Sequence, residues 1–470
     1  MEPIAAIATG GGTAATAIGI IRISGDGCFD ACGRVFRANG GTPFSELPPR
    51  RLVLGELLDN QGRVIDRGLA VRFPGPHSYT GEDCAELHCH GSPVVLREVL
   101  SALSAAGARR AGPGEFTKRA FLNGRLDLTQ AEAVMDLIDA ETAAAARNAA
   151  AQLDGGLRRR LEPIQETLLE VASRFYAVVD YPDEDIEDAG PEEISAALET
   201  AEKALTALLD TCRRGQVLKR GVRTAIVGLP NAGKSSLLNA LAGRERAIVT
   251  EVPGTTRDTV EESVLCGGVL LRLTDTAGLR KTEDPVEKLG VERSRQAMES
   301  ADLILLVEDS STALYPELEE NWMDRYVIRR QVAEAGKPWI CVHSKCDLSG
   351  IVGGSSTLFG EGANNPAATV FVSAKTGQGL DQLEQAVAVL FPAGNPAEAG
   401  SLLTDQRQED AARRALDALR RGRETLEGGL TPDAALTDVE EALDALGELT
   451  GRSAREEIVS GIFSRFCVGK

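Results

Sequence analysis

The segment Gly228-Leu229-Pro230-Asn231-Ala232-Gly233-Lys234-Ser235 decides the fold of the central part of this chain. It matches the pattern Gly-x-x-x-x-Gly-Lys-Ser/Thr and directly follows a short apolar run. In this pattern backbone N–H groups wrap a phosphate chain, the lysine is the catalytic cation that neutralises it, and the final hydroxyl binds Mg²⁺. The predicted nucleotide-binding residues of this segment are Asn231, Ala232, Gly233, Lys234, Ser235 and Ser236.

Apolar runs with the length of strands surround this loop and alternate with helical sequence. They are Val222–Val227, Val269–Leu273, Leu303–Val307, Trp339–Val342 and Thr369–Val372. Alternating strands and helices predict a doubly wound parallel sheet that ends near Pro392. The segment Gly350–Ala368 is rich in Gly, Ser and Asn, so we expect a surface loop there.

Two further motifs lie where they could contact Mg²⁺ and the γ-phosphate. Asp275-Thr276-Ala277-Gly278 follows the second apolar run, so the aspartate could bind Mg²⁺ through water and the glycine amide could meet the γ-phosphate. Thr255 and Thr256 lie earlier, in a Pro-Gly-Thr-Thr-Arg-Asp loop suited to closing on the ion and the phosphate.

The motifs after the last two apolar runs predict a guanine site. In Ser344-Lys345-Cys346-Asp347, the carboxylate of Asp347 could accept hydrogen bonds from guanine N1 and its exocyclic amine, and Lys345 could lie along the base. Ser373-Ala374-Lys375 could offer a backbone amide to the guanine oxygen. An asparagine usually stands where Ser344 is, and the shorter serine hydroxyl predicts weaker nucleotide binding with guanine preference kept by Asp347.

The residue expected to orient the attacking water in Ras-like enzymes, a glutamine after Asp-Thr-Ala-Gly, is replaced here by Leu279. Leucine cannot hydrogen-bond to water, so hydrolysis needs another group. Asn231, with Thr250–Thr256 nearby in sequence, suggests a monovalent cation in place of an arginine finger. On the loop pattern alone, an ordinary turn asparagine is the less favoured alternative for Asn231.

The flanking sequence predicts two other kinds of domain. Residues 1–120 mix strand candidates at Ala17–Ile23 and Arg51–Leu57 with a helix at Ser92–Ala106, which is an α+β pattern. Residues 121–214 and 393–470 are helical in texture, and the acidic run Asp183–Asp188 is expected to be a solvated turn between long helices. We expect a multidomain chain in which the GTPase-like domain, 215–392, is inserted into a helical domain whose two parts pack together.

Composition excludes several classes of protein. The 470 residues are 43% hydrophobic and 26% charged, as in globular proteins, and their net charge of −19 argues against a chain that coats nucleic acid by itself. Residues 1–120 are near neutral, with 13 Lys and Arg against 12 Asp and Glu. Nine cysteines without a Cys-x-x-Cys pair favour a reducing, cytoplasmic location, and no stretch predicts a signal peptide or a membrane span.

With these motifs the chain resembles the MnmE family, also called TrmE, of the TrmE-Era-EngA-like P-loop GTPases. The resemblance covers nearly the whole length because motifs outside the nucleotide site match it too. They are Gly19–Gly25, Tyr79–Asp83, Glu86–Gly91, Pro113–Thr117, Ala120–Leu128 and Phe466–Lys470.

The resemblance implies roles that the residues alone do not show. It implies potassium ligands at Asn231, Thr250, Val252 and Thr255, magnesium ligands at Ser235 and Thr256, and Glu287 as the residue that positions the hydrolytic water. It further implies a tetrahydrofolate derivative, 5-formyl- or methylene-tetrahydrofolate, bound by Arg22, Glu86, Arg125 and Lys470, with Cys467 as a catalytic candidate. Arg22 and Glu86 are expected on neighbouring strands, and Arg125 stands where the family commonly has lysine, which keeps the charge but changes the donor geometry.

The activity implied by the family is modification of tRNA. A homodimer held by the N-terminal domains works with the flavoprotein MnmG, as a heterotetramer, to add a carboxymethylaminomethyl or aminomethyl group at C5 of wobble uridine 34. Two other classes stay open from the residues alone: a ribosome-assembly or signalling GTPase whose flanks only bind a partner, and a folate-binding carrier with a vestigial GTPase domain. His88 and His90 would share one strand face, but two ligands without a second cluster predict zinc there only weakly.

Overall fold

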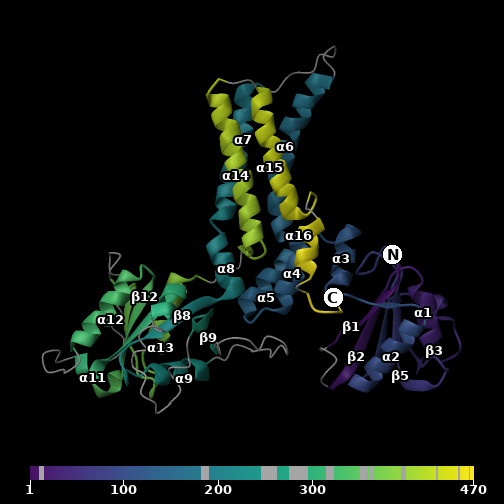
Figure 1. Cartoon of the computed structure of the whole chain (residues 1–470), viewed down its shortest axis with the longest axis horizontal. Helices are drawn as coiled ribbons and strands as arrows, with labels where there is room; N and C mark the ends of the chain where they lie inside the picture. The colour runs from purple at the N-terminus through teal and green to yellow at the C-terminus, as the bar shows by residue number, and fades with distance from the viewer. Residues whose placement is uncertain are drawn as a thin grey trace. The chain divides into compact units, whose positions relative to one another are not determined.

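The computed structural model describes residues 1–9, 15–180, 190–244, 262–274, 295–313, 322–349, 357–358, 365–392, 398–429, 432–453, 456–464 and 466–469. The chain forms two compact units, labelled by element in Figure 1. Unit 1 comprises Met1–Met135, Gln152–Ala201 and Arg414–Lys470, and unit 2 comprises Asp136–Ala151 and Glu202–Arg413. The division into four segments made from the sequence stays a prediction.

Unit 1 begins with a seven-stranded, mostly antiparallel sheet in the order β3-β4-β5-β6-β2-β1-β7. The strands are β1 Ile4–Ile7, β2 Thr16–Ser24, β3 Phe36–Ala38, β4 Val53–Leu58, β5 Val64–Phe73, β6 Cys84–Gly91 and β7 Arg109–Arg110. Helices α1, Cys28–Val35, and α2, Pro93–Ala105, supply Cys28, Val35, Leu96 and Leu103 to its buried core. The expected strands and helix of residues 1–120 are therefore confirmed.

Helices make up the rest of unit 1. They are α3 Glu115–Leu122, α4 Leu128–Ile138, α5 Ala143–Leu153, α6 Gly156–Asp180, α7 Pro191–Leu209, α14 Gln406–Glu427, α15 Pro432–Thr450 and α16 Glu456–Phe463, some of which continue into unit 2. The Tyr176 hydroxyl of α6 donates a hydrogen bond to Glu440 of α15, which confirms that helices from before and after the inserted domain pack together. The acidic run at 183–188 lies outside the described residues.

Unit 2 contains a second seven-stranded sheet, in the order β13-β14-β12-β11-β8-β10-β9. Its strands are β8 Val222–Val227, β9 Glu262–Cys266, β10 Val269–Thr274, β11 Leu303–Asp309, β12 Trp339–Ser344, β13 Thr357–Leu358 and β14 Ala368–Phe371. All five strands expected from the sequence are present and parallel, whereas the edge strands β9 and β13 are antiparallel and were not predicted. Gly267 and Gly268, both with positive φ, form the tight turn that pairs β9 with β10.

Helices cover both faces of this sheet. They include α8 Cys212–Arg220, α9 Lys234–Arg244, α11 Ser310–Ala313, α12 Trp322–Glu334 and α13 Leu380–Leu390. Residues of α9 and α13 bury one face, and Val332 of α12 helps to bury the other. Strand β8 lies between β10 and β11, where the chain order reverses, and ligands of such sheets bind beyond the carboxyl ends of the strands at this point. In the described parts of the chain, none of the helices has the length and apolar character needed to cross a membrane.

Candidate functional site

The phosphate-binding loop connects β8 to α9, as predicted. Gly228 has φ 149°, and a side chain there would clash with the carbonyl oxygen of Val307 on the neighbouring strand β11. Asn231 has φ 60°, a left-handed conformation that asparagine tolerates better than most residues, and Gly233 has φ 96°. The residues that define the motif therefore set the shape of the loop. Asn231 forms the turn through its backbone, whether or not its side chain binds an ion.

Lys234, the first residue of α9, holds the loop in this shape. Its ammonium donates to the carbonyl oxygens of Gly228 and Leu229, at 2.8 and 2.7 Å. Burial lowers the pKa of the Lys234 ammonium, and no carboxylate of the described residues pairs with it. A half-buried cation beside the N-terminus of a helix, bonded to carbonyl oxygens, fits the phosphates of a nucleotide.

The predicted guanine motif contacts the phosphate-binding loop directly. The Ser344 hydroxyl, at the end of β12, lies 2.5 Å from the carbonyl oxygen of Ala232 and 3.3 Å from that of Glu308. The Lys345 ammonium donates to the carbonyl oxygen of Asn231 at 2.9 Å. These contacts are possible because β12 and β8 both end at the same edge of the parallel sheet.

The exposed carboxylate of Asp347 pairs with no side chain of the described residues, so it is available to a base. The Ser373–Lys375 segment adjoins it, because the Cys346 amide donates to the carbonyl oxygen of Val372 at 3.3 Å. The Ser373 amide is already bonded to the carbonyl oxygen of Gln378 at 2.9 Å. The amides of Ala374 or Lys375 are therefore better placed than that of Ser373 to meet a guanine oxygen.

Asp309, the last residue of β11, belongs to this site and was missed from the sequence. Its carboxylate accepts a hydrogen bond from the Lys345 ammonium at 2.6 Å. Burial raises the pKa of the Asp309 carboxyl, but hydrogen bonds from Lys345 and Ser311 outweigh it, so the pKa lies below its ordinary value. Its position just after a predicted strand is common to many acids that only support structure, so the sequence alone carries no specific signal for it.

The remaining predicted residues of this site lie outside the described parts of the chain. They are Thr250, Val252, Thr255, Thr256, Asp275, Thr276, Ala277, Gly278, Leu279 and Glu287. Their roles, which include three of the four predicted potassium ligands and one of the two predicted magnesium ligands, stay predictions.

In unit 1, Arg22 and Glu86 form an ion pair across strands β2 and β6. They are directly paired in register, and the Arg22 Nε and Nη2 atoms donate to Glu86 Oε1 at 3.0 and 2.9 Å. The pKa of the Glu86 carboxyl lies below its ordinary value, because the contacts from His88 and Arg22 outweigh the opposing effect of partial burial. The guanidinium of Arg22 also lies 5.2 Å from the ring centre of Tyr79 and 5.9 Å from that of Phe116. These groups form a half-buried, aromatic-walled ion pair.

The C-terminal segment packs within the same unit, far from where it lies in the sequence. Val468 forms a β-bridge with Pro113, and the Gly114 amide donates to the Cys467 carbonyl oxygen at 3.4 Å. Gly469 has φ 108°, and a side chain there would clash with the carbonyl oxygen of Ile7. The tail is thus fitted against the residues just before α3, with the Cys467 thiol exposed. Lys470 lies outside the described residues.

The three remaining residues of interest in unit 1 have ordinary surroundings. Arg125 is exposed, and its Cγ packs close to Gly81 of the loop that carries Tyr79. His88 contacts Glu86 at 3.4 Å, whereas His90 contacts Asp66 at 2.9 Å. Each histidine therefore has its own carboxylate partner.

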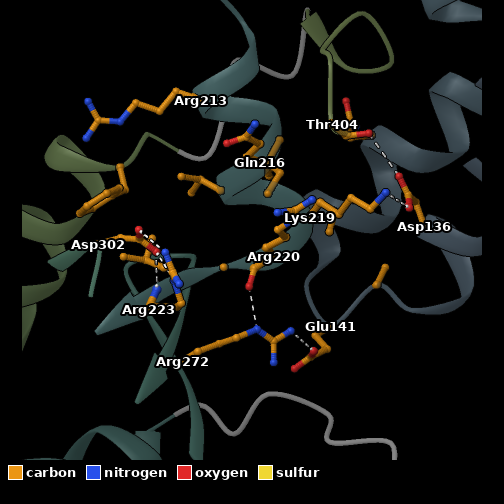
Figure 2. Close-up of a pocket in the computed structure, with 18 of the residues that line it drawn as sticks. Asp136, Glu141, Arg213, Gln216, Lys219, Arg220, Arg223, Arg272, Asp302 and Thr404 are labelled. Atoms are coloured by element: carbon orange, nitrogen blue, oxygen red, sulfur yellow. Dashed lines mark hydrogen bonds and ion pairs between the residues drawn. The ribbon is translucent and has the colours of Figure 1, made fainter. Parts of the chain in front are cut away.

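A cavity of about 750 Å³ opens at the opposite, amino-terminal end of the unit 2 strands (Figure 2). Arg272 of β10 donates to Glu141 at 2.6 Å and to the carbonyl oxygen of Arg220 at 2.6 Å. Lys219 pairs with Asp136 at 2.8 Å (Figure 2). Six basic and four acidic residues line this cavity, so basic residues are in excess, and the phosphate-binding loop contributes nothing to it.

A nucleotide-binding loop after the central strand of a parallel sheet, with a guanine motif bonded to it, defines the class as P-loop GTPase. Family models named for the GTP-binding protein TrmE N-terminus and the MnmE helical domain match residues 3–125 and 128–467. The chain belongs to the MnmE family.

Full-length relatives are similar from end to end. Proteins named tRNA modification GTPase MnmE are 44% identical in Symbiobacterium thermophilum and 43% in Roseiflexus sp., each over 100% of this chain and 99% of the relative. The Aquifex aeolicus protein of the same name is 42% identical over 100% of both chains. A solved structure, the G domain of the T. maritima FeoB iron transporter, is 25% identical over 36% of this chain and 97% of that one, with a TM-score of 0.24.

Proposed function

We propose that this chain hydrolyses GTP in order to modify tRNA, adding a carboxymethylaminomethyl or aminomethyl group at C5 of wobble uridine 34. The proposal includes a homodimer, the flavoprotein MnmG as partner, and a one-carbon unit from a tetrahydrofolate derivative, all acting in the cytoplasm. The observation that carries the GTP part is the direct bonding of the guanine motif to the phosphate-binding loop, through Ser344 and Lys345. Family membership at more than 40% identity supports the tRNA part.

GTP would be held by residues that already converge. The Lys234 ammonium would exchange its two loop carbonyls for phosphate oxygens, and its charge would stabilise the transition state of phosphoryl transfer. Ser235 would bind Mg²⁺, which would neutralise charge on the phosphates. Asp347 would select guanine, because its free carboxylate can accept two hydrogen bonds from that base and none of this kind from adenine.

We further propose that potassium stimulates hydrolysis when two GTPase domains pair. Asn231 would contribute its side-chain oxygen, with Thr250, Val252 and Thr255 as the other ligands and Glu287 positioning the water through a second water. Leu279 supports the need for such help, because it offers no hydrogen bond to water.

The folate part of the proposal is supported by the chemistry of the Arg22–Glu86 pair. Both hydrogen bonds from Arg22 end on Oε1 of Glu86, while Oε2 has only a 3.4 Å contact with His88. Oε2 is therefore suited to accept hydrogen bonds from a pterin ring, and the partly exposed ring of Tyr79 offers aromatic surface to it. Arg125 and Lys470 would bind the anionic tail.

The test is mass analysis of wobble uridines in a strain that lacks this chain. We expect the modified nucleoside to disappear, to return with the parent chain, and to stay absent with Lys234→Ala. A nucleoside profile unchanged by the deletion would reject the tRNA function and favour a ribosome-assembly or signalling GTPase. Full rescue by Lys234→Ala would instead indicate a folate carrier that does not need GTP.

A further inference from the structure

Three side chains of different chemistry meet under α12 in unit 2. Glu308 and His343 directly precede Asp309 and Ser344 of the nucleotide site, so their side chains lie on the other face of the sheet. Glu308 of β11 and His343 of β12 are directly paired in register, and Cys341 lies two residues before His343 on the same face. One carboxylate oxygen, one thiol sulfur and one imidazole nitrogen lie within 4.8 Å of one another. Neighbouring strands therefore present three potential metal ligands to one point.

The separations suit a small ion. Cys341 Sγ lies 3.7 Å from Glu308 Oε2 and 3.6 Å from His343 Nε2. Zinc bonds of about 2.0–2.3 Å at tetrahedral angles place neighbouring ligand atoms roughly 3.4–3.6 Å apart. One ligand atom from each of the three residues lies within 4.8 Å of the other two, so side-chain rotations that bring them slightly closer would form one face of such a tetrahedron.

The site also contains an unsatisfied group. His343 Nδ1 is buried without a hydrogen-bond partner, since its distance of 3.8 Å to Glu308 Oε2 is too long for one. The ring is held in place by stacking on Phe371, with 4.7 Å between ring centres. Nδ1, not the Nε2 atom that lies near Cys341, is the nitrogen without a partner, so an ion bound through Nδ1 would recover the free energy that its burial costs.

We propose that Glu308, Cys341 and His343 form a binding site for a divalent transition metal of the Zn²⁺ type. Thiolate and imidazole ligands select such ions over Mg²⁺, which prefers oxygen. Three protein ligands leave a fourth position for water, as in open zinc sites. Binding converts the Cys341 thiol to a thiolate, and the proton passes to solvent.

Two arginines of α12 oppose tight binding. Arg325 donates to Glu308 Oε2 at 3.1 Å, and Arg329 lies 3.9 Å from the same atom. An incoming cation must displace Arg325 from this oxygen and bear the repulsion of both guanidinium groups. The site should therefore be of moderate affinity, and removing the Arg325 charge should tighten it.

The experiment uses the full chain with Cys467→Ser as background, because the exposed Cys467 thiol is a competing ligand. The metal-free protein is titrated with Co²⁺, and separately with Zn²⁺, in excess Mg²⁺ and without nucleotide. We expect one Co²⁺ per chain with a sulfur-to-metal absorption band. Cys341→Ser should lose the band, and Cys266→Ser, another buried cysteine of the same sheet, should keep it.

Two further variants protect the test against misfolding of Cys341→Ser. His343→Gln, near the surface at 13% side-chain exposure, should weaken binding by at least the roughly 10–100-fold that loss of an outer-shell partner costs. Arg325→Met should strengthen it. The proposal would be overturned if the parent protein showed no thiolate-to-metal band. It would also be overturned if neither His343→Gln nor Arg325→Met changed the affinity for Co²⁺.

Discussion

The phosphate-binding loop of unit 2 and the Arg22–Glu86 pair of unit 1 are built in different ways. The loop is one continuous segment whose contacts are made largely by backbone atoms, such as the two carbonyls that hold Lys234. The unit 1 site uses side chains from separate strands and loops, and the tail carrying Val468 closes against Pro113 beside α3. A site made of backbone can be recognised from a short motif, whereas a site made of distant side chains depends on the whole fold around it.

The largest effect expected from this difference is in the loop. Lys234→Ala should lower kcat for GTP hydrolysis by roughly 10²–10³-fold, because the only side-chain cation proposed to contact the transferred phosphate is lost. Steady-state phosphate release measures it. The matched control is Lys337→Ala, which changes a lysine lining the cavity at the opposite end of the same sheet. Equal losses in the two variants would show that the effect is one of stability rather than of site chemistry.

The unit 1 site should be sensitive to a change that leaves its shape intact. Glu86→Gln removes a charge but no volume, and it should weaken 5-formyltetrahydrofolate binding by more than about tenfold, since a charge-assisted hydrogen bond is lost. Calorimetry on the full chain measures the affinity. Glu56→Gln is the control, because Glu56 also pairs with arginines of the same sheet. Unchanged folate affinity in Glu86→Gln would remove Glu86 from the site.

A substitution of Asn231 tests whether this residue serves the phosphate-binding loop through its backbone conformation alone or also through its side chain. Asn231→Gly keeps the positive φ of 60° but removes the side-chain oxygen, and it should abolish a potassium stimulation of about tenfold. GTPase rates in potassium and in sodium decide the matter. If the variant keeps the full stimulation, Asn231 is a turn residue and the ion site lies elsewhere.

Acid should destabilise unit 1 through Glu115. Burial raises the pKa of this carboxyl, but hydrogen bonds from Arg109, the Gly112 amide and Arg119 lower it from 4.5 to about 2. Because the folded-state pKa is the lower one, the stabilisation is present above pH 4.5 and is lost as pH falls towards 2. Glu115→Gln should cost about 1 kcal/mol at neutral pH and flatten the acid limb of denaturant unfolding. An unchanged acid limb would contradict this.

Ser344 should produce the smallest effect. Its single hydroxyl donor is shared between the Ala232 and Glu308 carbonyls, at 2.5 and 3.3 Å, whereas an asparagine amide has two donors. Ser344→Asn should therefore strengthen GDP binding by roughly threefold. Fluorescence titration measures this, with Ser349→Asn as a control just beyond the motif. Weaker GDP binding would show that the pocket cannot accept the larger side chain.

Particular residues show how far the sequence alone could predict the molecule. The five parallel strands and the loop were predicted because apolar runs and glycine positions act locally. The antiparallel strand β9 was missed, because Glu262–Cys266 is short and its pairing with β10 depends on a turn rather than on composition. Asp309 was missed because an acid at the end of a strand has no distinct pattern until Lys345 lies beside it.

The sequence by itself determined the nucleotide class of this protein, because Gly228, Gly233 and Lys234 act through backbone shape and charge within a few residues of one another. Only the tertiary structure decided which distant groups meet. It brought Arg22 onto Glu86, Val468 onto Pro113, and Glu308 close to Cys341 and His343. These contacts depend on strand register and on the packing of the chain end. Both are set by cooperative burial of the whole core rather than by any local sequence.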